Sequence, residues 1–121
     1  MKKIKFAAGR VEEFACEGGK SQSFLWDTAS PGLGLRVTSK GAKSYIFQGK
    51  LDGATIRLTI GDPRTWDIVK AQAEARRLKV LLDNGQDPRK VRDDALAAER
   101  DARAMQEAAV VAEQEKQLRE S

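Results

Sequence analysis

The sequence predicts an α+β domain in which a three-stranded antiparallel β-sheet packs against one α-helix, with a short helix before the sheet and a linker helix at the C-terminal end. Three observations predict this fold. Apolar and polar residues alternate in short runs between residues 33 and 60, an Asp-Gly pair separates the last two runs, and an apolar stripe at helical spacing follows them. The length of 121 residues suits one small domain with an appendage.

The first 32 residues predict short elements before the sheet. Ile4 and Phe6 alternate with lysines, which is typical of a short strand or an extended arm. Apolar side chains at helical spacing within residues 11–15 predict two turns of helix, which a glycine pair ends. Residues 23–28 read as an extended segment, and the Ser-Pro-Gly sequence at 30–32 turns the chain.

The three runs at 33–38, 43–51 and 54–60 predict the strands of the sheet. In the first and third runs, every second residue is a leucine, an isoleucine or a valine. Asp52 and Gly53 lie between the second and third runs, and this pair is a strong signal for a two-residue hairpin. We therefore expect an antiparallel meander with one apolar face and one polar face.

The segment after the sheet predicts the helix that covers the apolar face. Thr65 is the expected N-cap, and apolar residues at 68, 71, 75, 78 and 82 form one stripe along the helix. Asn84 and Gly85 end this helix, and Pro88 reinforces the stop. Because one strand face needs cover and one helix stripe needs burial, we expect the helix to pack across the apolar sheet face.

The composition changes after Pro88. Residues 90–119 are rich in Ala, Glu, Arg, Asp and Gln, which favours a helix, but large apolar residues are sparse and form no regular heptad. This pattern predicts a solvated linker helix. The expected domains are therefore residues 1–92, the folded domain, and residues 93–121, a helical linker whose partner lies outside this chain.

Composition excludes several classes of function. The sequence has no histidine and a single cysteine, Cys16, which excludes Ser-His-Asp and Cys-His catalysis, multi-cysteine zinc sites and an intrachain disulfide. No apolar run approaches the ~20 residues of a membrane span, and no signal-peptide core follows residues 1–6. We expect a cytoplasmic, non-enzymatic module with no cofactor, no metal, no membrane contact and no small-molecule substrate.

The charge is unevenly distributed along the chain. The net charge is +4, with +6 on residues 1–86 and −2 on residues 87–121. A basic body attracts phosphate because each neutralised phosphate releases counterions. On charge alone, a role in solubility is the first interpretation and phosphate binding is the alternative.

The polar face of the predicted sheet carries the candidate DNA-binding residues. Arginine reads guanine bidentately, glutamine reads adenine, and threonine contacts a phosphate or a thymine methyl group. A ribbon of strands fits a major groove ~12 Å wide, and the predicted face has no carboxylate. Ile46 is the one misfit, expected to meet a thymine methyl group or the N-terminal segment. The candidates are Arg36, Thr38, Lys40, Lys43, Ser44, Gln48, Lys50, Thr55, Arg57 and Thr59.

Several other conspicuous residues have structural interpretations. Tyr45 and Phe47 share one strand face and are expected in the core, with base stacking as the alternative. Trp26 and Trp66 are expected to anchor the edges of the sheet. Asp27 is expected to accept structural hydrogen bonds rather than to bind a metal, because no second carboxylate lies near it at a metal-loop spacing.

Over residues 1 to about 92, the sequence resembles the amino-terminal domain of phage- and island-type integrases of the tyrosine recombinase family. The motifs that carry the resemblance occur in order: Trp26-Asp27, Pro31-Gly32-Leu33-Gly34-Leu35-Arg36-Val37, Gly41-Ala42-Lys43-Ser44, Leu58-Thr59-Ile60-Gly61 and Gly85-Gln86-Asp87-Pro88. The resemblance implies an arm-type DNA-binding domain whose sheet, backed by a helix, enters the major groove beside the recombination core. It further implies a bacterial or prophage-encoded, nucleoid-associated protein that supports DNA integration and recombination.

The same resemblance implies that residues 93–121 lead toward a core-binding domain and that catalysis belongs to a part outside this chain. A tyrosine recombinase needs a nucleophilic tyrosine together with arginines and a histidine or similar partner. Tyr45 is the only tyrosine here, it lies in a predicted strand, and histidine is absent.

Two alternatives to DNA binding stay open from the sequence. One is a protein-interaction module that recruits another recombinase subunit or an accessory factor such as an excisionase, and salt-dependent binding to duplex DNA distinguishes it. The other is a double-stranded RNA binder, which contacts 2′-hydroxyl groups and is distinguished by replacing DNA with RNA.

Overall fold

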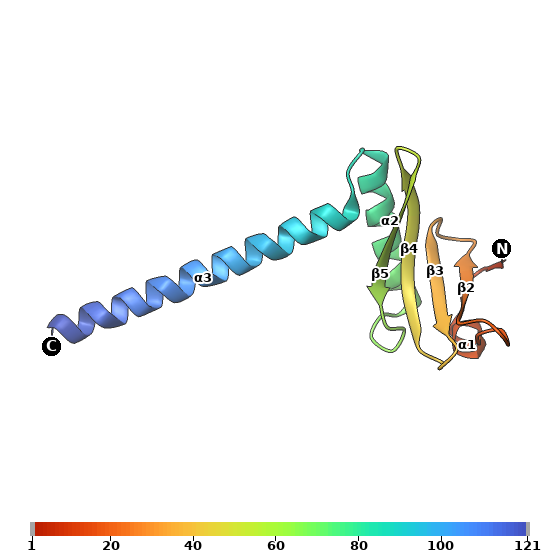
Figure 1. The fold of residues 1–121 in the computed structure, drawn as a ribbon, viewed down its shortest axis with the longest axis horizontal. Helices are drawn as coiled ribbons and strands as arrows, with labels where there is room; N and C mark the ends of the chain where they lie inside the picture. Colours follow the sequence, from red (N-terminus) through yellow and green to blue (C-terminus); the bar gives the residue numbers. More distant parts are fainter. Residues whose placement is uncertain (1, 121) are drawn as a thin grey trace. The chain divides into compact units, whose positions relative to one another are not determined.

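The computed structural model describes residues 2–120, which form two compact units (Figure 1). The first unit ends at Pro88 and holds a β-sheet with two helices, α1 (Ala8–Glu13) and α2 (Ile68–Asp83). The second unit begins at Arg89 and consists of the helix α3 (Pro88–Glu120) beyond its first residue. The α+β class predicted from the sequence is confirmed.

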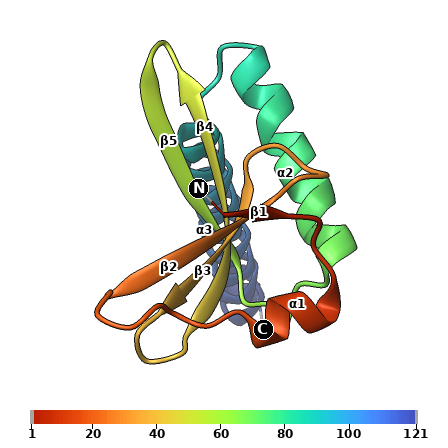
Figure 2. The same ribbon diagram turned by 90° about the vertical axis from the view of Figure 1, so that its right-hand side faces the viewer.

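The sheet of the first unit has five strands, arranged in chain order. The outermost strand pairs in parallel with its neighbour, and the other neighbours pair antiparallel. Figure 2 shows α2 lying along one face of this twisted sheet. The strands are β1 (Lys3–Ile4), β2 (Gln22–Asp27), β3 (Leu33–Thr38), β4 (Lys43–Leu51) and β5 (Ala54–Gly61).

The prediction of three strands is wrong, although the meander of β3, β4 and β5 is present as expected. The prediction did not include β2 in the sheet, because Phe24, Leu25 and Trp26 are all apolar and the strand shows no alternation of polarity. For β1 the prediction allowed either a short strand or an extended arm, because two residues are too few for a periodic pattern.

The hairpin between β4 and β5 has the turn that the Asp-Gly pair predicts. Asp52 has a φ of 50° and Gly53 a φ of 82°. Two consecutive residues with positive φ are the hallmark of a type I′ turn, whose twist matches that of the flanking strands. This turn fixes the register of the hairpin, in which Gln48 pairs with Arg57 and Lys50 with Thr55.

One face of the sheet is covered by α2, as predicted. Ala71 and Ala75 are completely buried, and their small side chains let the helix lie close to the strands. Leu82 fills the space that a Cβ atom on Gly49 would occupy. The core on this side comprises Leu25, Leu33, Leu35, Val37, Tyr45, Phe47, Ile56, Leu58, Ile60, Ala71, Ala75, Leu78 and Leu82, with Phe6 and Val11 from the N-terminal segment.

The start of α2 differs from the prediction, while its end agrees. Thr65 is not the N-cap, because its N–H and that of Trp66 donate to the Asp62 carbonyl in a turn that precedes the helix. The N-cap is Asp67, whose carboxylate accepts the N–H of Lys70 at 2.7 Å. At the other end, Gly85 has a φ of 75° and closes the helix, as its position predicts.

The carboxylate of Asp27 joins three parts of the first unit. It accepts hydrogen bonds from the Phe6 N–H at 3.2 Å, from the Ala29 N–H at 3.0 Å and from Gln72 Nε2 at 2.9 Å. Asp27 is only 5% exposed. The prediction of a structural acceptor at this position is confirmed, since the side chain ties the N-terminal segment and the loop after β2 to α2.

Helix α3 is a solvated helix, as its composition predicts. All of its side chains from Asp93 to Glu120 are exposed except the half-buried Ala97, and Val110 and Leu118 are 57% and 76% exposed. Within residues 2–120, no helix combines the length and the apolar character that a membrane span requires.

Candidate nucleic-acid interface

The face of the sheet opposite α2, called the open face below, carries most of the predicted DNA-binding residues. Arg36 on β3 pairs with Phe24 on β2 and with Ser44 on β4, and directly paired residues point to the same side of a sheet. Eight of the ten predicted residues belong to this face: Arg36, Thr38, Ser44, Gln48, Lys50, Thr55, Arg57 and Thr59.

The other two predicted residues lie elsewhere. Lys40 is exposed in the turn between β3 and β4, because β3 ends at Thr38 and not beyond it. Lys43 pairs with Val37 and therefore points to the face that α2 covers. Its ammonium group donates to the carbonyl oxygens of Val11 and Glu12, so it caps the C-terminal end of α1.

Further residues of the open face come from β1 and β2, which were not predicted as part of the sheet; besides Gln22, which pairs with Thr38, they are Phe24, Trp26 and Lys3. Phe24 and Trp26 lie two positions apart on β2, and Lys3 on β1 pairs with Trp26. The spacing of two between the aromatic residues is the signal that identifies them, since it puts both rings on one face of any strand. Trp26 is therefore a member of the open face and not only an anchor of its edge.

The two aromatic rings form a small apolar layer on the open face. The rings of Phe24 and Trp26 are stacked, with centroids 5.9 Å apart and planes at 12°. Trp26 lies over Gly34, where a Cβ atom would come within 2.7 Å of the indole ring. Ile46 pairs with Gly34 and is only 1% exposed. Ile46, the misfit of the predicted polar face, is thus buried beside Gly34 and the Trp26 layer and is not exposed to solvent.

Arg57 extends from β5 across the open face to this layer. Its guanidinium carbon lies 4.8 Å from the centre of the Phe24 ring, and its Nε donates to Gln48 Oε1 at 3.0 Å. Two strands separate β5 from β2 in the sheet. The contact therefore requires a strongly curved sheet whose open face is concave, in keeping with the different directions of β5 and β2 in Figure 2.

The charge on the open face has one sign. Lys3, Arg36, Lys50 and Arg57 belong to it, and none of its described residues is a carboxylate. The nearest acidic group after β5 is already paired: the Arg64 guanidinium lies 2.8 Å from Asp62 Oδ2 and lowers the pKa of that carboxyl to about 2. The face thus offers cations and hydrogen-bonding side chains to an anionic partner.

Tyr45 lies on the other side of the sheet, in the core. It is 1% exposed, and burial raises the pKa of its hydroxyl, with a smaller contribution from the charges of Asp67 and Asp27. The prediction that Tyr45 and Phe47 belong to the core is confirmed. A buried phenol with a raised pKa is poorly suited to act as a nucleophile.

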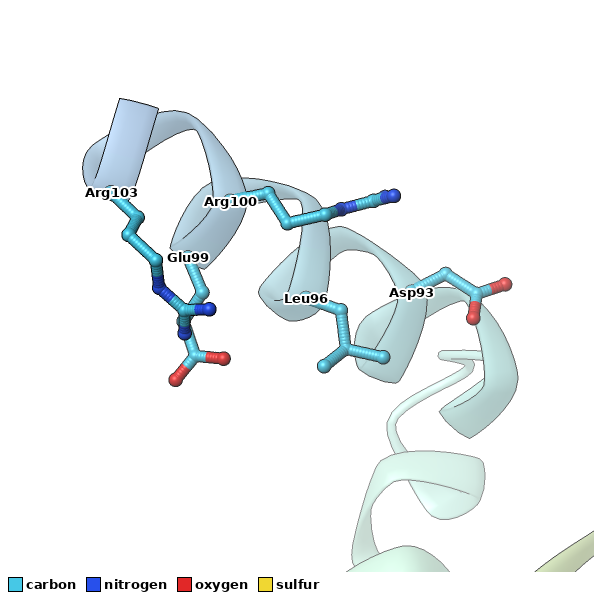
Figure 3. A pocket seen from close by; sticks show the side chains of 5 residues that line it. All are labelled: Asp93, Leu96, Glu99, Arg100 and Arg103. Carbon is cyan, nitrogen blue, oxygen red and sulfur yellow. The ribbon is translucent and has the colours of Figure 1, made fainter. Parts of the chain in front are cut away.

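The surface of the described residues carries several open hollows. One of about 230 Å³ adjoins Trp26 and Gln48 on the open face. Another of about 370 Å³ runs along α3 and is drawn in Figure 3, where its side chains project from successive turns of one helix. Its lining is Asp93, Leu96, Glu99, Arg100 and Arg103. A hollow made by one solvated helix encloses no ligand.

Within the described residues, no group of three or more histidine, cysteine or acidic side chains is placed to hold a metal ion.

Comparison with known proteins gives the family of the first unit. Residues 3–95 match the family described as the arm DNA-binding domain. The chain is 46% identical over 89 residues to the prophage integrase IntF of Escherichia coli K12, an alignment that covers 74% of this chain and 19% of that protein. The chain thus spans about a fifth of the length of this curated relative. No solved structure gave a significant match.

Proposed function

This chain belongs to the arm DNA-binding domain family, and on that basis we propose that it binds arm-type sites in double-stranded DNA as part of a site-specific tyrosine recombinase. In this proposal the open face enters the major groove, and binding supports integration and recombination of a prophage or similar element. The membership covers residues 3–95 and so includes every strand of the sheet.

The observation that best supports the proposal is the composition of the open face. Strand side chains there combine arginine, lysine, glutamine and threonine with no carboxylate among the described residues, whereas the whole chain has 18 acidic residues. Such a face attracts phosphates through its cations and presents donors to base edges. The curved sheet carries these cations and donors both at its centre and at its rim. A single orientation on the duplex would therefore let the central side chains contact base edges and the rim side chains contact phosphates.

The proposed contacts divide by position. Lys3 and Lys50 at the rim of the open face, and Lys40 in the turn between β3 and β4, are flexible point charges suited to phosphates, which fix the register of the protein on the duplex. The arginines lie further inside the face. Arg36 is half-buried between its neighbours on β2 and β4, and Arg57 reaches the Phe24 ring. Arginine is the commonest reader of guanine in the major groove.

In the parent recombinase, this domain would position the enzyme and not perform its chemistry. Binding at an arm site raises the effective concentration of linked domains near the core site. Other integrase subunits or an excisionase are the protein partners that such an assembly would use. The chain by itself is expected to cleave no strand, because Tyr45, its only tyrosine, is buried in the core. Relaxation of supercoiled DNA by the purified chain that disappears in Tyr45→Phe would contradict this.

The test of the proposal is a double substitution, Arg36→Ala with Arg57→Ala, titrated against a labelled duplex at two salt concentrations. The expected result is a folded protein that loses at least ~2 kcal/mol of binding to its preferred duplex. A duplex RNA of the same sequence serves as the second probe, and it should bind weakly.

The matched control is Arg76→Ala with Arg77→Ala, which removes the same charge from exposed positions of α2. Its affinity for DNA should stay close to that of the parent chain. Unchanged affinity in the sheet variant together with a loss in the helix variant would move the interface to α2. The absence of salt-dependent binding to either nucleic acid would favour a protein-interaction module.

A further inference from the structure

Arg57 differs from the other cations of the open face in being held in place. Its guanidinium lies over the Phe24 ring, with the cation 4.8 Å from the ring centre, and hydrogen-bonds to Gln48. Within residues 2–120, no hydrogen bond or ion pair fixes the charged groups of Arg36 or Lys50. A side chain that is already ordered before binding loses less conformational freedom when its ligand arrives.

The hydrogen bonds to Gln48 leave donors at the tip of the Arg57 guanidinium, on Nη1 and Nη2, available to a ligand. Gln48 Oε1 accepts from Nε at 3.0 Å and from Nη2 at 2.5 Å, which occupies one side of the planar group. A guanidinium has five N–H donors, so three stay available on Nη1 and Nη2. Two of them form the parallel pair at the tip that matches two acceptors of a planar partner.

The ring under Arg57 is itself supported. Phe24 stacks on Trp26, and Trp26 lies against the backbone at Gly34, where only a glycine leaves room for the indole. Ile46 is buried at the same place. The Arg57 guanidinium thus rests on Phe24, Phe24 on Trp26, and Trp26 on the backbone at Gly34. These protein contacts orient the plane of the guanidinium.

This geometry fits one feature of duplex DNA. In the major groove, guanine presents O6 and N7 as two adjacent acceptors, which a parallel pair of N–H donors matches. A phosphate also accepts such a pair, but phosphates line the rim of the groove, and Arg57 reaches over the interior of the concave face to β2.

We infer that Arg57 is the residue that reads a guanine in the DNA site, and that Gln48 and Phe24 are positioning residues that hold its guanidinium. The inference rests on the proposed function and assigns a residue within it. It also changes the expected role of Gln48: since its Oε1 is occupied by Arg57, Gln48 orients the arginine and does not read an adenine bidentately.

The experiment uses the whole chain and a pool of short duplexes with a randomised centre. The parent chain selects its preferred duplex, which is then titrated beside versions that differ from it at one base pair each. The central variant is Arg57→Lys, which keeps the charge but removes both the planar fork and the stack on Phe24.

The expected result is the loss of one base preference. The parent chain should favour a G·C pair at one position by roughly 5- to 150-fold, and Arg57→Lys should reduce this preference to less than about threefold while binding a non-selected duplex as before. Phe24→Leu should weaken the same preference, whereas Phe24→Tyr, which keeps the ring, should retain it. Circular dichroism and thermal melting establish that each variant is folded.

The matched control is Lys50→Ala, an exposed cation on the rim of the same face. It should weaken binding to every duplex alike and reduce the salt slope by about one, with the selected sequence unchanged.

Two results would overturn the inference and are distinguishable from each other. If the parent chain selects a sequence and Arg57→Lys selects the same one with equal discrimination, or loses preference at a base other than guanine, Arg57 is not the reader and the proposed function stands. If the parent chain selects no sequence, the inference fails together with the proposed function.

Discussion

The two faces of the one sheet are packed in different ways. The face under α2 is closed by side chains from strands and helix that interdigitate, and Leu33, Phe47 and Ala71 there have no exposed surface. The open face has a single aromatic layer, Phe24 on Trp26, with the Arg57 guanidinium on top of it. The covered face therefore supplies most of the stability, and the open face supplies an ordered polar surface without a second core.

The largest expected effect tests the covered face. Phe47→Ala removes a completely buried ring from the centre of β4, and it should lower the free energy of unfolding by about 3–5 kcal/mol. Chemical denaturation measures the difference. Lys50→Ala, an exposed change on the same strand, is the control and should stay within about 0.5 kcal/mol of the parent chain. Equal losses in both variants would contradict the contrast between the faces.

A smaller loss is expected from overpacking the open face. In Gly34→Ala the new Cβ atom would come within 2.7 Å of the Trp26 ring, so the indole has to move. Crowding of this kind costs about 1–3 kcal/mol. Thermal melting gives the stability, and Trp26 fluorescence, measured with Trp66→Phe in both proteins, reports the displaced ring. An unchanged emission spectrum would show that the ring does not lie over residue 34.

The contact between Arg57 and Phe24 should contribute less again. A double-mutant cycle of Arg57→Ala and Phe24→Ala isolates it, and an exposed cation–π contact is worth about 0.5–1 kcal/mol. Denaturant unfolding of the four proteins gives the coupling energy. A coupling near zero would mean that the guanidinium leaves the ring in solution, and the open face would then be less ordered than the covered one.

The smallest effect is expected from the ion pair between Arg64 and Asp62, which belongs to neither face of the sheet. The Arg64 guanidinium lowers the pKa of the half-buried Asp62 from 3.8 to about 2, so the carboxylate favours the folded state when ionised. That contribution is complete above the unfolded pKa and disappears as the pH falls from about 4 to about 2. As the pH is lowered over this range, the melting temperature of Asp62→Asn should fall slightly less steeply than that of the parent chain. A steeper fall in the variant would contradict a stabilising role of the ionised carboxylate.

The covered face was predictable from the sequence because its signals are local. The alternation in β3 and β5, the Asp-Gly turn and the apolar stripe of α2 each determine an element, and burial of apolar surface brings these elements together. The N-cap of α2 was misplaced because Thr65 and Asp67 are both good caps. The choice between them depends on a turn at Asp62 that the composition does not reveal.

The open face was predictable only in part. Alternation along β3, β4 and β5 found eight of the residues on it, since side chains two apart share a face. Phe24 and Trp26 were missed because the apolar run in β2 shows no alternation, and Lys3 was missed because β1 is two residues long and pairs with a strand distant in the chain. The reach of Arg57 to Phe24 depends on the curvature of the whole sheet, and no local pattern encodes that distance.

The three hydrogen bonds of Asp27 also imply an order of folding. Its partners lie 2, 21 and 45 residues away along the chain. The bond to Ala29 closes within a single turn, whereas those to Phe6 and Gln72 require larger loops to close first, and loop closure costs more entropy as the loop lengthens. We therefore expect β1 and α2 to settle onto a preformed β2 edge. During synthesis, the Asp27 carboxylate stays without its last partner until α2 has left the ribosome.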